Sequence, residues 1–363
     1  MSDNTVLQRI LKEVEQIRDK VLRGEKPSMR FPLRNLSNVR FDPKEGKFKI
    51  GRKSKERTLS VATVKTFAQS LKMIALAKRL IETDDIATKR EAYYVAKGWA
   101  EEVRFGEQVE SDGVLDDVEA LFSVNREQLG FVPEEKGGEV AGNLVVYDQD
   151  RDTGAELAID CTRFGSGAYS IPISVEHLRF ESSAKFVLAI ETAGMFQRLA
   201  KHNYWRTAEC ILISMGGVPT RATRRFIRRM SEELDIEVYA FVDCDPYGIC
   251  NIYRTLKVGS GNAAHINEAF CVPKARYLGV TPYDIENYNL PTHGMTEVDI
   301  KRIDDALKND PFIQYHLSWQ QALEHLKSGG RRAEQQAFAV HDLNHVIDTY
   351  LPDKLAAVGD FLP

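Results

Sequence analysis

Three apolar runs of strand length dominate the second half of the chain, and a helix-like segment follows each of them. The runs cover residues 186–190, 210–214 and 236–242 and contain many β-branched and aromatic side chains. Short apolar runs that end abruptly are typical of buried strands. Because strands that alternate with helices build βαβ units, the pattern predicts an α/β fold with a parallel sheet.

Polar residues and glycines stand where these strands end. Glu191 follows the first run, a Gly-Gly-x-Pro turn at residues 216–219 follows the second, and Asp243 and Asp245 follow the third. Parallel strands point their carboxyl ends to one edge, where open α/β sheets bind ligands, so we expect the three carboxylates to meet there. Oxygen ligands suit Mg²⁺ better than zinc or copper. An isolated Asp-x-Asp is usually a solvated turn, and only the combination indicates a metal site.

The first half of the chain has a mainly helical pattern. Apolar side chains recur at helical spacing over residues 6–22 and 61–82, as in amphipathic helices. Shorter helical patterns follow at 113–122 and 125–129, and a glycine-rich loop then precedes a strand at 142–147. This order is that of a winged helix, a helix-turn-helix variant of the CAP-like type, which places one helix in the DNA major groove. Many small α/β domains share the same order.

A tyrosine pair lies near the start of one predicted helix. Thr88 and Glu91 have capping-box spacing, so a helix is expected to start at Thr88 with Tyr93 and Tyr94 in its second turn. Arg90 lies one turn before Tyr94 on the same face. A tyrosine beside an arginine is usually a surface hydrogen-bonding pair. The functional alternative is a nucleophile next to a cation that binds phosphate.

Two basic segments point to phosphate contacts. Residues 51–57 form a basic loop, which is either a solvated linker or a phosphate contact. The helix predicted after the Gly-Gly-x-Pro turn carries a stripe of arginines on one face and apolar residues that can cover the sheet. The stripe consists of Arg221, Arg224, Arg225, Arg228 and Arg229. Acidic residues at 232, 233 and 235 would balance a solvated face, but five arginines on one face favour a role in tracking DNA phosphates.

Composition narrows the class of protein. A chain of 363 residues is long enough for two or three domains. The net charge of −4 argues against a uniformly basic nucleic-acid binder, so DNA binding must rely on local patches. Five cysteines without C-x-x-C spacing indicate reduced thiols in a cytoplasmic protein. We expect no membrane span and no secretory signal, and the chain has no P-loop.

Four segments together resemble the family of DNA topoisomerase VI A subunits and, more distantly, the meiotic proteins that make double-strand breaks. These segments are residues 90–94, 190–196, 215–219 and 242–248, and the resemblance runs from about residue 60 to the C-terminus. It implies that Tyr94 is the nucleophile that forms a 5′-phosphotyrosyl ester. Glu191, Asp243 and Asp245 would hold Mg²⁺, Glu191 would also act as a general acid or base, and Arg90 would stabilise charge in the transition state.

The resemblance also implies a domain order and partners. We expect a partner-binding extension over 1–60, a winged-helix domain over 61–150, a β-rich connector over 151–182, and a Rossmann-like Toprim domain over 183–363. The substrate would be double-stranded DNA. A homodimer would join the tyrosine of one chain to the metal site of the other, and an ATPase B subunit would complete an A₂B₂ heterotetramer, with the N-terminal helix as its candidate contact.

Three functions compete at this point. The first is the DNA-cleaving subunit of an ATP-dependent type IIB topoisomerase, which religates after strand passage in the cytoplasm, at the nucleoid. The second is a meiotic-type break-forming protein or a Toprim nuclease. The third is a non-enzymatic winged-helix regulator, which would have no need of carboxylates at the strand ends. The carboxylates favour an enzyme, and the compact chain favours the topoisomerase subunit.

Overall fold

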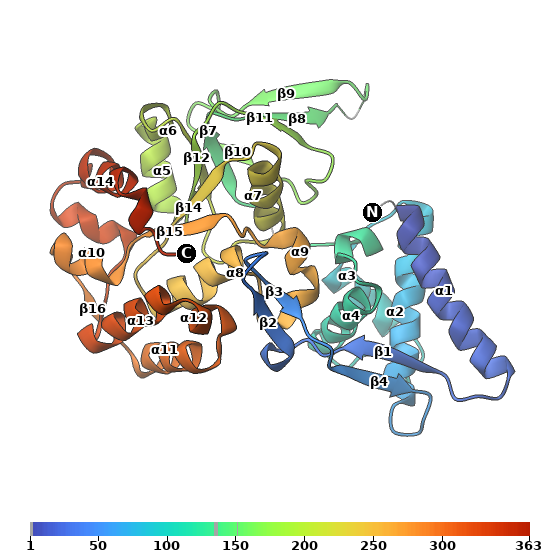
Figure 1. The fold of residues 1–363 in the computed structure, drawn as a ribbon. Coiled ribbons are helices and arrows are strands. Elements are labelled where there is room, and N and C mark those ends of the chain that lie inside the picture. Colours follow the sequence, from blue (N-terminus) through green and yellow to red (C-terminus); the bar gives the residue numbers. More distant parts are fainter. Residues whose placement is uncertain (1–2, 134–136, 151) are drawn as a thin grey trace. The chain divides into compact units, whose positions relative to one another are not determined.

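The computed structural model describes residues 3–133, 137–150 and 152–363. The chain forms two compact units, which are described separately. The first contains Met1–Arg40, Lys49–Glu135 and Gly261–Glu268, and the second contains Phe41–Phe48, Lys136–Ser260 and Ala269–Pro363. Figure 1 labels the helices and strands of both.

The first unit is mainly helical. Its helices are α1 (Asp3–Leu22), α2 (Val64–Thr83), α3 (Lys89–Lys97) and α4 (Gln108–Phe122), with short 3₁₀ turns at Arg126–Leu129 and Gly261–Ile266. Strand β1 (Ser28–Pro32) pairs antiparallel with β4 (Ser54–Thr58), and β5 (Ala87–Thr88) pairs parallel with β6 (Phe131–Val132). Residues 51–57, expected as a loop, therefore lie largely in a strand.

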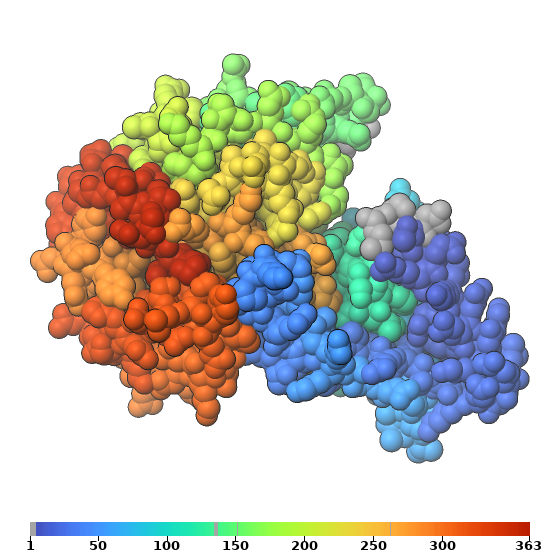
Figure 2. Space-filling model, in the orientation of Figure 1, coloured from blue at the N-terminus to red at the C-terminus, as the bar shows by residue number. Residues whose placement is uncertain are grey.

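The core of this unit lies between the helices. Val6, Ile10 and Ile17 of α1 are buried with side chains of α2 and α4 in one apolar cluster. The periodicity over 6–22 thus correctly predicted a helix, and the apolar face of this helix packs on its own unit. The opposite side of α1 belongs to the molecular surface, drawn in dark blue in Figure 2.

The second unit is built on a six-stranded sheet with the order β10-β7-β13-β12-β14-β15. Its parallel centre consists of β12 (Phe186–Ile190), β13 (Cys210–Ser214), β14 (Glu237–Phe241) and β15 (Ala275–Gly279). Strands β7 (Glu139–Gly142) and β10 (Tyr169–Ser170) extend one side antiparallel. The predicted parallel α/β sheet is confirmed. The strand expected over 142–147 is split, because β7 joins this sheet while β8 starts a smaller one.

The remaining elements are a smaller sheet, a hairpin and several short helices. Strands β8 (Val145–Gln149), β9 (Glu156–Asp160) and β11 (Arg179–Glu181) form a three-stranded antiparallel sheet. A short hairpin joins β2 (Val39–Asp42) to β3 (Lys47–Ile50). Helices follow at α5 (Ala193–Lys201), α6 (Tyr204–Thr207), α7 (Arg221–Glu233), α8 (Arg254–Lys257) and α9 (Asn267–Phe270), with a π-helix at Gly248–Tyr253.

The C-terminal part of the chain is mainly helical, with one pair of short strands that the sequence did not predict. Its helices are α10 (Pro282–Asn287), α11 (Glu297–Asn309), α12 (Pro311–Tyr315), α13 (Leu317–Gly329) and α14 (Leu351–Ala356). Two further helical turns lie at Gln335–Val340 and Val346–Tyr350, and a last 3₁₀ turn lies at Val358–Asp360. Strand β17 (Arg331–Arg332) pairs antiparallel with β16 (His293–Gly294).

Candidate active site

Glu191 and Asp243 are neighbours because their strands are neighbours. Strands β12 and β14 run parallel with Ile190 opposite Phe241, so both chains leave the sheet at the same edge. The Glu191 amide donates to the Phe241 carbonyl (3.0 Å), and the Asp243 amide donates to Oε2 of Glu191 (2.8 Å). The sheet itself therefore places the two carboxylates side by side, as the strand pattern predicted.

The glycine turn after β13 supports Glu191 from the side of β12 that faces away from β14. The Met215 amide donates to the Ile190 carbonyl (2.8 Å), and the Gly217 amide donates to the Glu191 carbonyl (3.0 Å). Gly216 and Gly217 have φ angles of +67° and +85°. Residues with a Cβ rarely adopt this conformation, so the two glycines allow the chain to turn tightly beneath the carboxylate.

The third carboxylate, Asp245, lies in the turn that follows β14. Its Oδ1 accepts a hydrogen bond from the Gly248 amide (2.6 Å), and its Oδ2 lies 3.9 Å from the Arg332 guanidinium. The side chain is thus held at the start of the π-helix, close to a cation from another part of the chain. The Asp-x-Asp pair belongs to a structured turn and is only partly exposed.

A segment that the sequence did not single out completes the site. Ala333 bridges Cys244 through two backbone hydrogen bonds of 2.8 and 3.1 Å, so residues 331–335 lie against the Asp-x-Asp turn. The Gln335 amide then donates to Oδ1 of Asp243 (2.8 Å). Its fully buried side chain donates to the Phe241 carbonyl (2.5 Å) and accepts from the Thr192 hydroxyl (2.7 Å). Gln335 therefore joins both carboxylate-bearing strand ends, and no pattern in the sequence reveals this.

Burial and mutual repulsion make the carboxylates unusually basic. Burial, with the charge of Asp243 adding to it, raises the pKa of Glu191 to about 8. Burial also raises the pKa of Asp243 to about 6, against the opposing effect of the Gln335 amide. The charge of Glu334 contributes to both shifts. Such a concentration of negative charge favours a proton or a cation between the side chains.

The donor set fits a hard divalent cation by its chemistry. All three side chains offer carboxylate oxygens, the preferred ligands of Mg²⁺. Their hydrogen bonds to backbone amides use Oε2 of Glu191, Oδ1 of Asp243 and Oδ1 of Asp245. Within the described residues, no group of three or more His, Cys, Asp or Glu side chains is drawn together closely enough to hold a metal ion. The side chains would thus have to adjust to bind one.

The two tyrosines of α3 differ in exposure. The capping box of Thr88 and Glu91 is present at the start of α3. Tyr93 is buried and its hydroxyl donates to the Gly106 carbonyl (3.0 Å), whereas 58% of Tyr94 is exposed. Arg90 is also exposed, and the Lys97 ammonium lies 5.7 Å from the Tyr94 ring centroid. Tyr94 therefore has a solvent-accessible hydroxyl in a basic setting, and it belongs to the other unit from the carboxylates.

The arginine stripe of α7 is largely engaged within the chain. Arg225 pairs with Glu176 (2.6 Å), Arg228 with Glu232 (2.5 Å) and Arg229 with Glu233 (2.6 Å). Arg224 is buried, and Arg221 lies 4.6 Å from the ring centroid of Phe270. Phe226, Ile227 and Met230 are buried as predicted. These contacts anchor α7, and a DNA-binding role for the stripe stays a prediction.

Comparisons with known proteins cover almost the whole chain. Family models match residues 65–131 (Type IIB DNA topoisomerase), 134–184 (All-beta domain in DNA topoisomerase VI alpha subunit) and 186–355 (the Toprim domain of the topoisomerase 6 A chain and Spo11). A protein of Methanocaldococcus jannaschii, named as the A subunit of type 2 DNA topoisomerase 6, is 49% identical over 98% of this chain and 96% of its own length. Proteins of the same name from Methanothermobacter thermautotrophicus and Natronomonas pharaonis are 36% and 33% identical, over 94% and 98% of this chain and 94% and 97% of their own lengths. No helix of the described residues is long and apolar enough to cross a membrane.

Proposed function

Since the chain belongs to the family of type 2 DNA topoisomerase 6 A subunits, we infer that it is the DNA-cleaving subunit of a type IIB DNA topoisomerase. Its second unit contains a Toprim domain, matched over residues 186–355, with a partly parallel sheet. Its substrate is DNA, and it works with a B subunit. The observation that carries this function is the pairing of Glu191 with Asp243 at the sheet edge, in a chain that also exposes a capped-helix tyrosine.

We propose that the Tyr94 hydroxyl attacks a DNA phosphorus. The phenolic oxygen forms the new bond to phosphorus, the bond to the 3′ oxygen breaks, and that oxygen leaves with a proton. The result is a 5′-phosphotyrosyl ester and a free 3′ hydroxyl. Phenol has a reference pKa of about 10, so the Tyr94 proton must be removed during attack. Religation is the reverse reaction and needs no other energy source, because an ester replaces an ester.

Arg90 and the carboxylates have separate roles in this proposal. Arg90, one turn before Tyr94 on α3, would bind the phosphate and stabilise its charge in the transition state. Glu191, Asp243 and Asp245 would hold Mg²⁺. When bound, this ion would neutralise phosphate charge and polarise the phosphorus. The raised pKa of Glu191 suits a group that gives a proton to the leaving 3′ oxygen and later takes it back.

The finer assembly is part of the proposal. Because Tyr94 and the carboxylates belong to different units, a homodimer in which each tyrosine meets the partner's metal site would supply two cleavage sites, one for each strand of a duplex. Two B subunits would complete an A₂B₂ enzyme acting at the nucleoid. The outer face of α1 is the candidate contact for B, since its inner face is buried. The winged-helix interpretation of residues 61–150 and the boundaries at 60, 150 and 182 stay predictions.

The decisive experiment compares two tyrosines that differ in exposure. Wild-type protein, Tyr94→Phe and Tyr93→Phe would each be incubated with supercoiled plasmid, Mg²⁺, ATP and the B subunit. The products would be denatured and assayed for double-strand breaks and for protein attached to DNA 5′ ends. We expect Tyr94→Phe to lose both the breaks and the adduct. Tyr93→Phe removes only the hydrogen bond to Gly106 and should keep both.

Two other outcomes would contradict the assignment of Tyr94 as the nucleophile. If Tyr94→Phe still cuts DNA and leaves free ends, the carboxylates act with water as the nucleophile, and the assignment of Tyr94 is wrong. If Tyr93→Phe alone abolishes the adduct, the nucleophile is the neighbouring tyrosine. In each case circular dichroism would show whether the variant keeps the helical content of the wild type.

A further inference from the structure

A cavity of about 450 Å³ in the first unit has an excess of positive charge. Four cationic side chains line it, against two carboxylates. The cations are Arg34, Lys55, Arg57 and Lys65, and the carboxylates are Glu110 and Asp117. The volume lies in the range of small-molecule sites in proteins. The reaction proposed above uses none of these residues.

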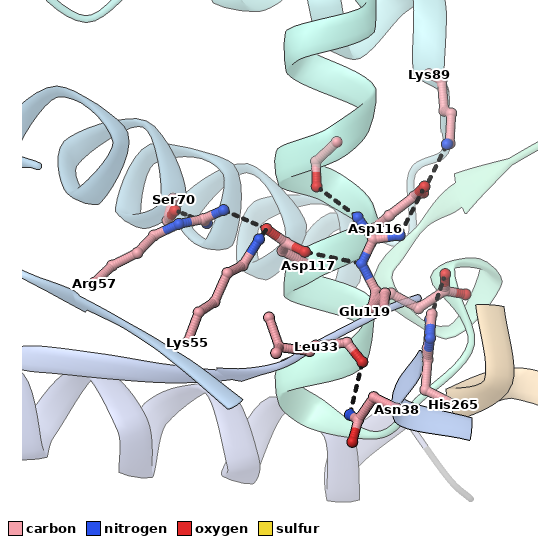
Figure 3. A network of polar contacts seen from close by, with 12 residues as sticks. Leu33, Asn38, Lys55, Arg57, Ser70, Lys89, Asp116, Asp117, Glu119 and His265 are labelled. Carbon is pink, nitrogen blue, oxygen red and sulfur yellow. Dashed lines mark hydrogen bonds and ion pairs between the residues drawn. The ribbon is translucent and has the colours of Figure 1, made fainter. Parts of the chain in front are cut away.

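Three of the cations converge on one buried carboxylate. Asp117 on α4 is 2% exposed, and it accepts from Nε of Arg34 (2.8 Å) and from Nζ of Lys55 (2.7 Å), while Arg57 contacts its Oδ2. Figure 3 shows Lys55 and Arg57 approaching Asp117 from β4. Burial alone would raise the pKa of Asp117, but the hydrogen bonds from Lys55 and Arg34 hold it below its usual range. Asp117 is therefore an anion that orients these cations without neutralising them.

The neighbouring acid does not remove this excess. Asp116 lies 3.5 Å from Arg34 and is also shared with Lys89 (2.7 Å). The two adjacent aspartates thus contact four cations in total. Arg34 and Arg57 are mostly buried, at 17% and 11% exposure of their side chains. Positive charge that is partly withdrawn from water and exceeds the nearby negative charge is costly, so an anion from solution would be stabilised here.

The N-terminus of α2 opens onto the same cavity. Lys65, Thr66 and Gln69 belong to the first turns of α2 and line the cavity wall. The helix has no acidic residue in its first turn, and its N-cap residue Thr63 donates its hydroxyl to the Thr58 carbonyl and makes no side-chain cap. The Val64 amide donates to the Ser60 carbonyl (2.7 Å), and the dipole at the start of the helix attracts anions. This feature is independent of the cation cluster and favours the same kind of ligand.

We propose that this cavity, which we call the basic cavity, is a binding site for a phosphate group, held by Lys55, Lys65 and the N-terminus of α2 over the Asp117 cluster. The lining carries two positive charges in excess, which matches the charge of a phosphate monoester near −2. A free phosphate compound such as a nucleoside monophosphate therefore fits better than a DNA diester, which carries one negative charge. The two sources share the same oxyanion chemistry, and experiment separates them.

The test uses the full-length chain without metal, so that cleavage plays no part. Inorganic phosphate and a nucleoside monophosphate would be titrated by calorimetry into wild-type protein and into the double variant Lys55→Gln/Lys65→Gln. Both lysines are exposed. Lys55 also contacts buried Asp117, which keeps its contacts with Arg34 and Arg57 in the double variant, and circular dichroism would show that this variant is folded. The matched control is Lys12→Gln/Lys78→Gln, which removes the same charge from positions on α1 and α2 outside the cavity.

We expect wild type and control to bind phosphate with a dissociation constant of roughly 1 mM or tighter. The double variant should bind at least about tenfold more weakly, as expected when a charge-assisted hydrogen bond is lost. The proposal is overturned if wild type does not bind phosphate, or if the double variant binds as well as the control.

A second arm identifies the source of the phosphate. Binding of a short DNA duplex would be measured at several salt concentrations with the same three proteins. If the double variant loses phosphate binding but keeps its DNA affinity and salt slope, the ligand is a free phosphate compound. If its salt slope falls by about 0.9 for each lost contact and inorganic phosphate competes with DNA, the cavity binds the DNA backbone. Both results support a phosphate site, and neither depends on Tyr94 being the nucleophile.

Discussion

Replacing Glu191 by Gln should stabilise the metal-free protein while abolishing cleavage. In the folded chain burial and neighbouring charge raise the pKa of Glu191 from 4.5 to about 8. At neutral pH folding must therefore protonate this side chain or bury its charge beside Asp243. A glutamine presents the neutral form at every pH. Its amide oxygen can still accept the hydrogen bond that the Asp243 amide donates to Glu191.

The size of the effect follows from the difference between the folded and unfolded pKa. For an acid whose pKa rises on folding, the extra stability of the protonated form is complete below the unfolded pKa and is lost as pH rises through the folded pKa. At pH 7, which lies about 2.5 units above the unfolded pKa of 4.5, the lost stability of the wild type amounts to at most about 3 kcal/mol, since one pKa unit corresponds to about 1.4 kcal/mol. Solvent that reaches this partly exposed side chain reduces this loss, so we expect Glu191→Gln to be more stable than the wild type by roughly 1–2 kcal/mol.

The assay is urea unfolding in EDTA from pH 5 to pH 9. The stability of the wild type should fall over this range relative to Glu191→Gln, and the variant should be the more stable protein at pH 8. Adding Mg²⁺ should stabilise the wild type and have little effect on the variant. Glu237→Gln is the matched control, because Glu237 is an exposed carboxylate at the other end of the neighbouring strand β14. A Glu191→Gln protein less stable than wild type at pH 8 would refute the reasoning.

Three further substitutions test other parts of the structure. Gln335→Ala should lower stability by about 1–3 kcal/mol, because it removes the two hydrogen bonds that this buried side chain makes with Phe241 and Thr192. It should also weaken Mn²⁺ binding measured by electron paramagnetic resonance, whereas the exposed Gln336→Ala should change neither quantity. Thr88→Ala should cost about 1 kcal/mol in urea unfolding by removing the α3 cap, and a cost near zero would exclude a stabilising capping box. Arg229→Gln should lower the melting temperature more than the DNA affinity, because Arg229 pairs with Glu233 and donates to backbone carbonyls; a lower DNA affinity with unchanged melting temperature would restore the stripe as a DNA contact.

The sheet and its carboxylates were predictable because they depend on local sequence and on one topological rule. Apolar runs identified β12, β13 and β14, and the parallel arrangement then fixed which ends meet. Glu191 and Asp243 had to become neighbours once β12 paired with β14. The capping box at Thr88 was equally local. In such cases the signal for each element lies within a few positions, and the parallel arrangement then brings together residues as far apart as Glu191 and Asp243.

The segment around Gln335 was not predictable for the opposite reason. Its contacts with Asp243, Phe241 and Thr192 join residues that are 92 to 143 positions apart. A 3₁₀ turn begins at Gln335, and the bridge between Ala333 and Cys244 just before it places the Gln335 backbone amide against Asp243. The arginines of α7 are a similar case. Their spacing predicts a helix with one arginine face, as observed. Their partners, however, include Glu176 and the carbonyls of Val175 and Leu178, which only the tertiary structure supplies.

The tertiary surroundings also explain why the pKa values of buried carboxylates shift in opposite directions in two clusters of this chain. At the sheet edge, Glu191, Asp243 and Asp245 face mainly each other and backbone amides, so the pKa values of Glu191 and Asp243 rise. In the first unit, Asp117 faces Arg34, Lys55 and Arg57, so its pKa falls. An excess of carboxylates attracts a metal ion, whereas an excess of cations attracts a phosphate. Adding Mg²⁺ should therefore stabilise the second unit, which contains the carboxylates, and adding phosphate should stabilise the first unit, which contains the basic cavity. Hydrogen exchange would measure the protection of backbone amides in each unit, first with Mg²⁺ alone and then with phosphate alone. If either ligand raised protection equally in both units, this division would be wrong.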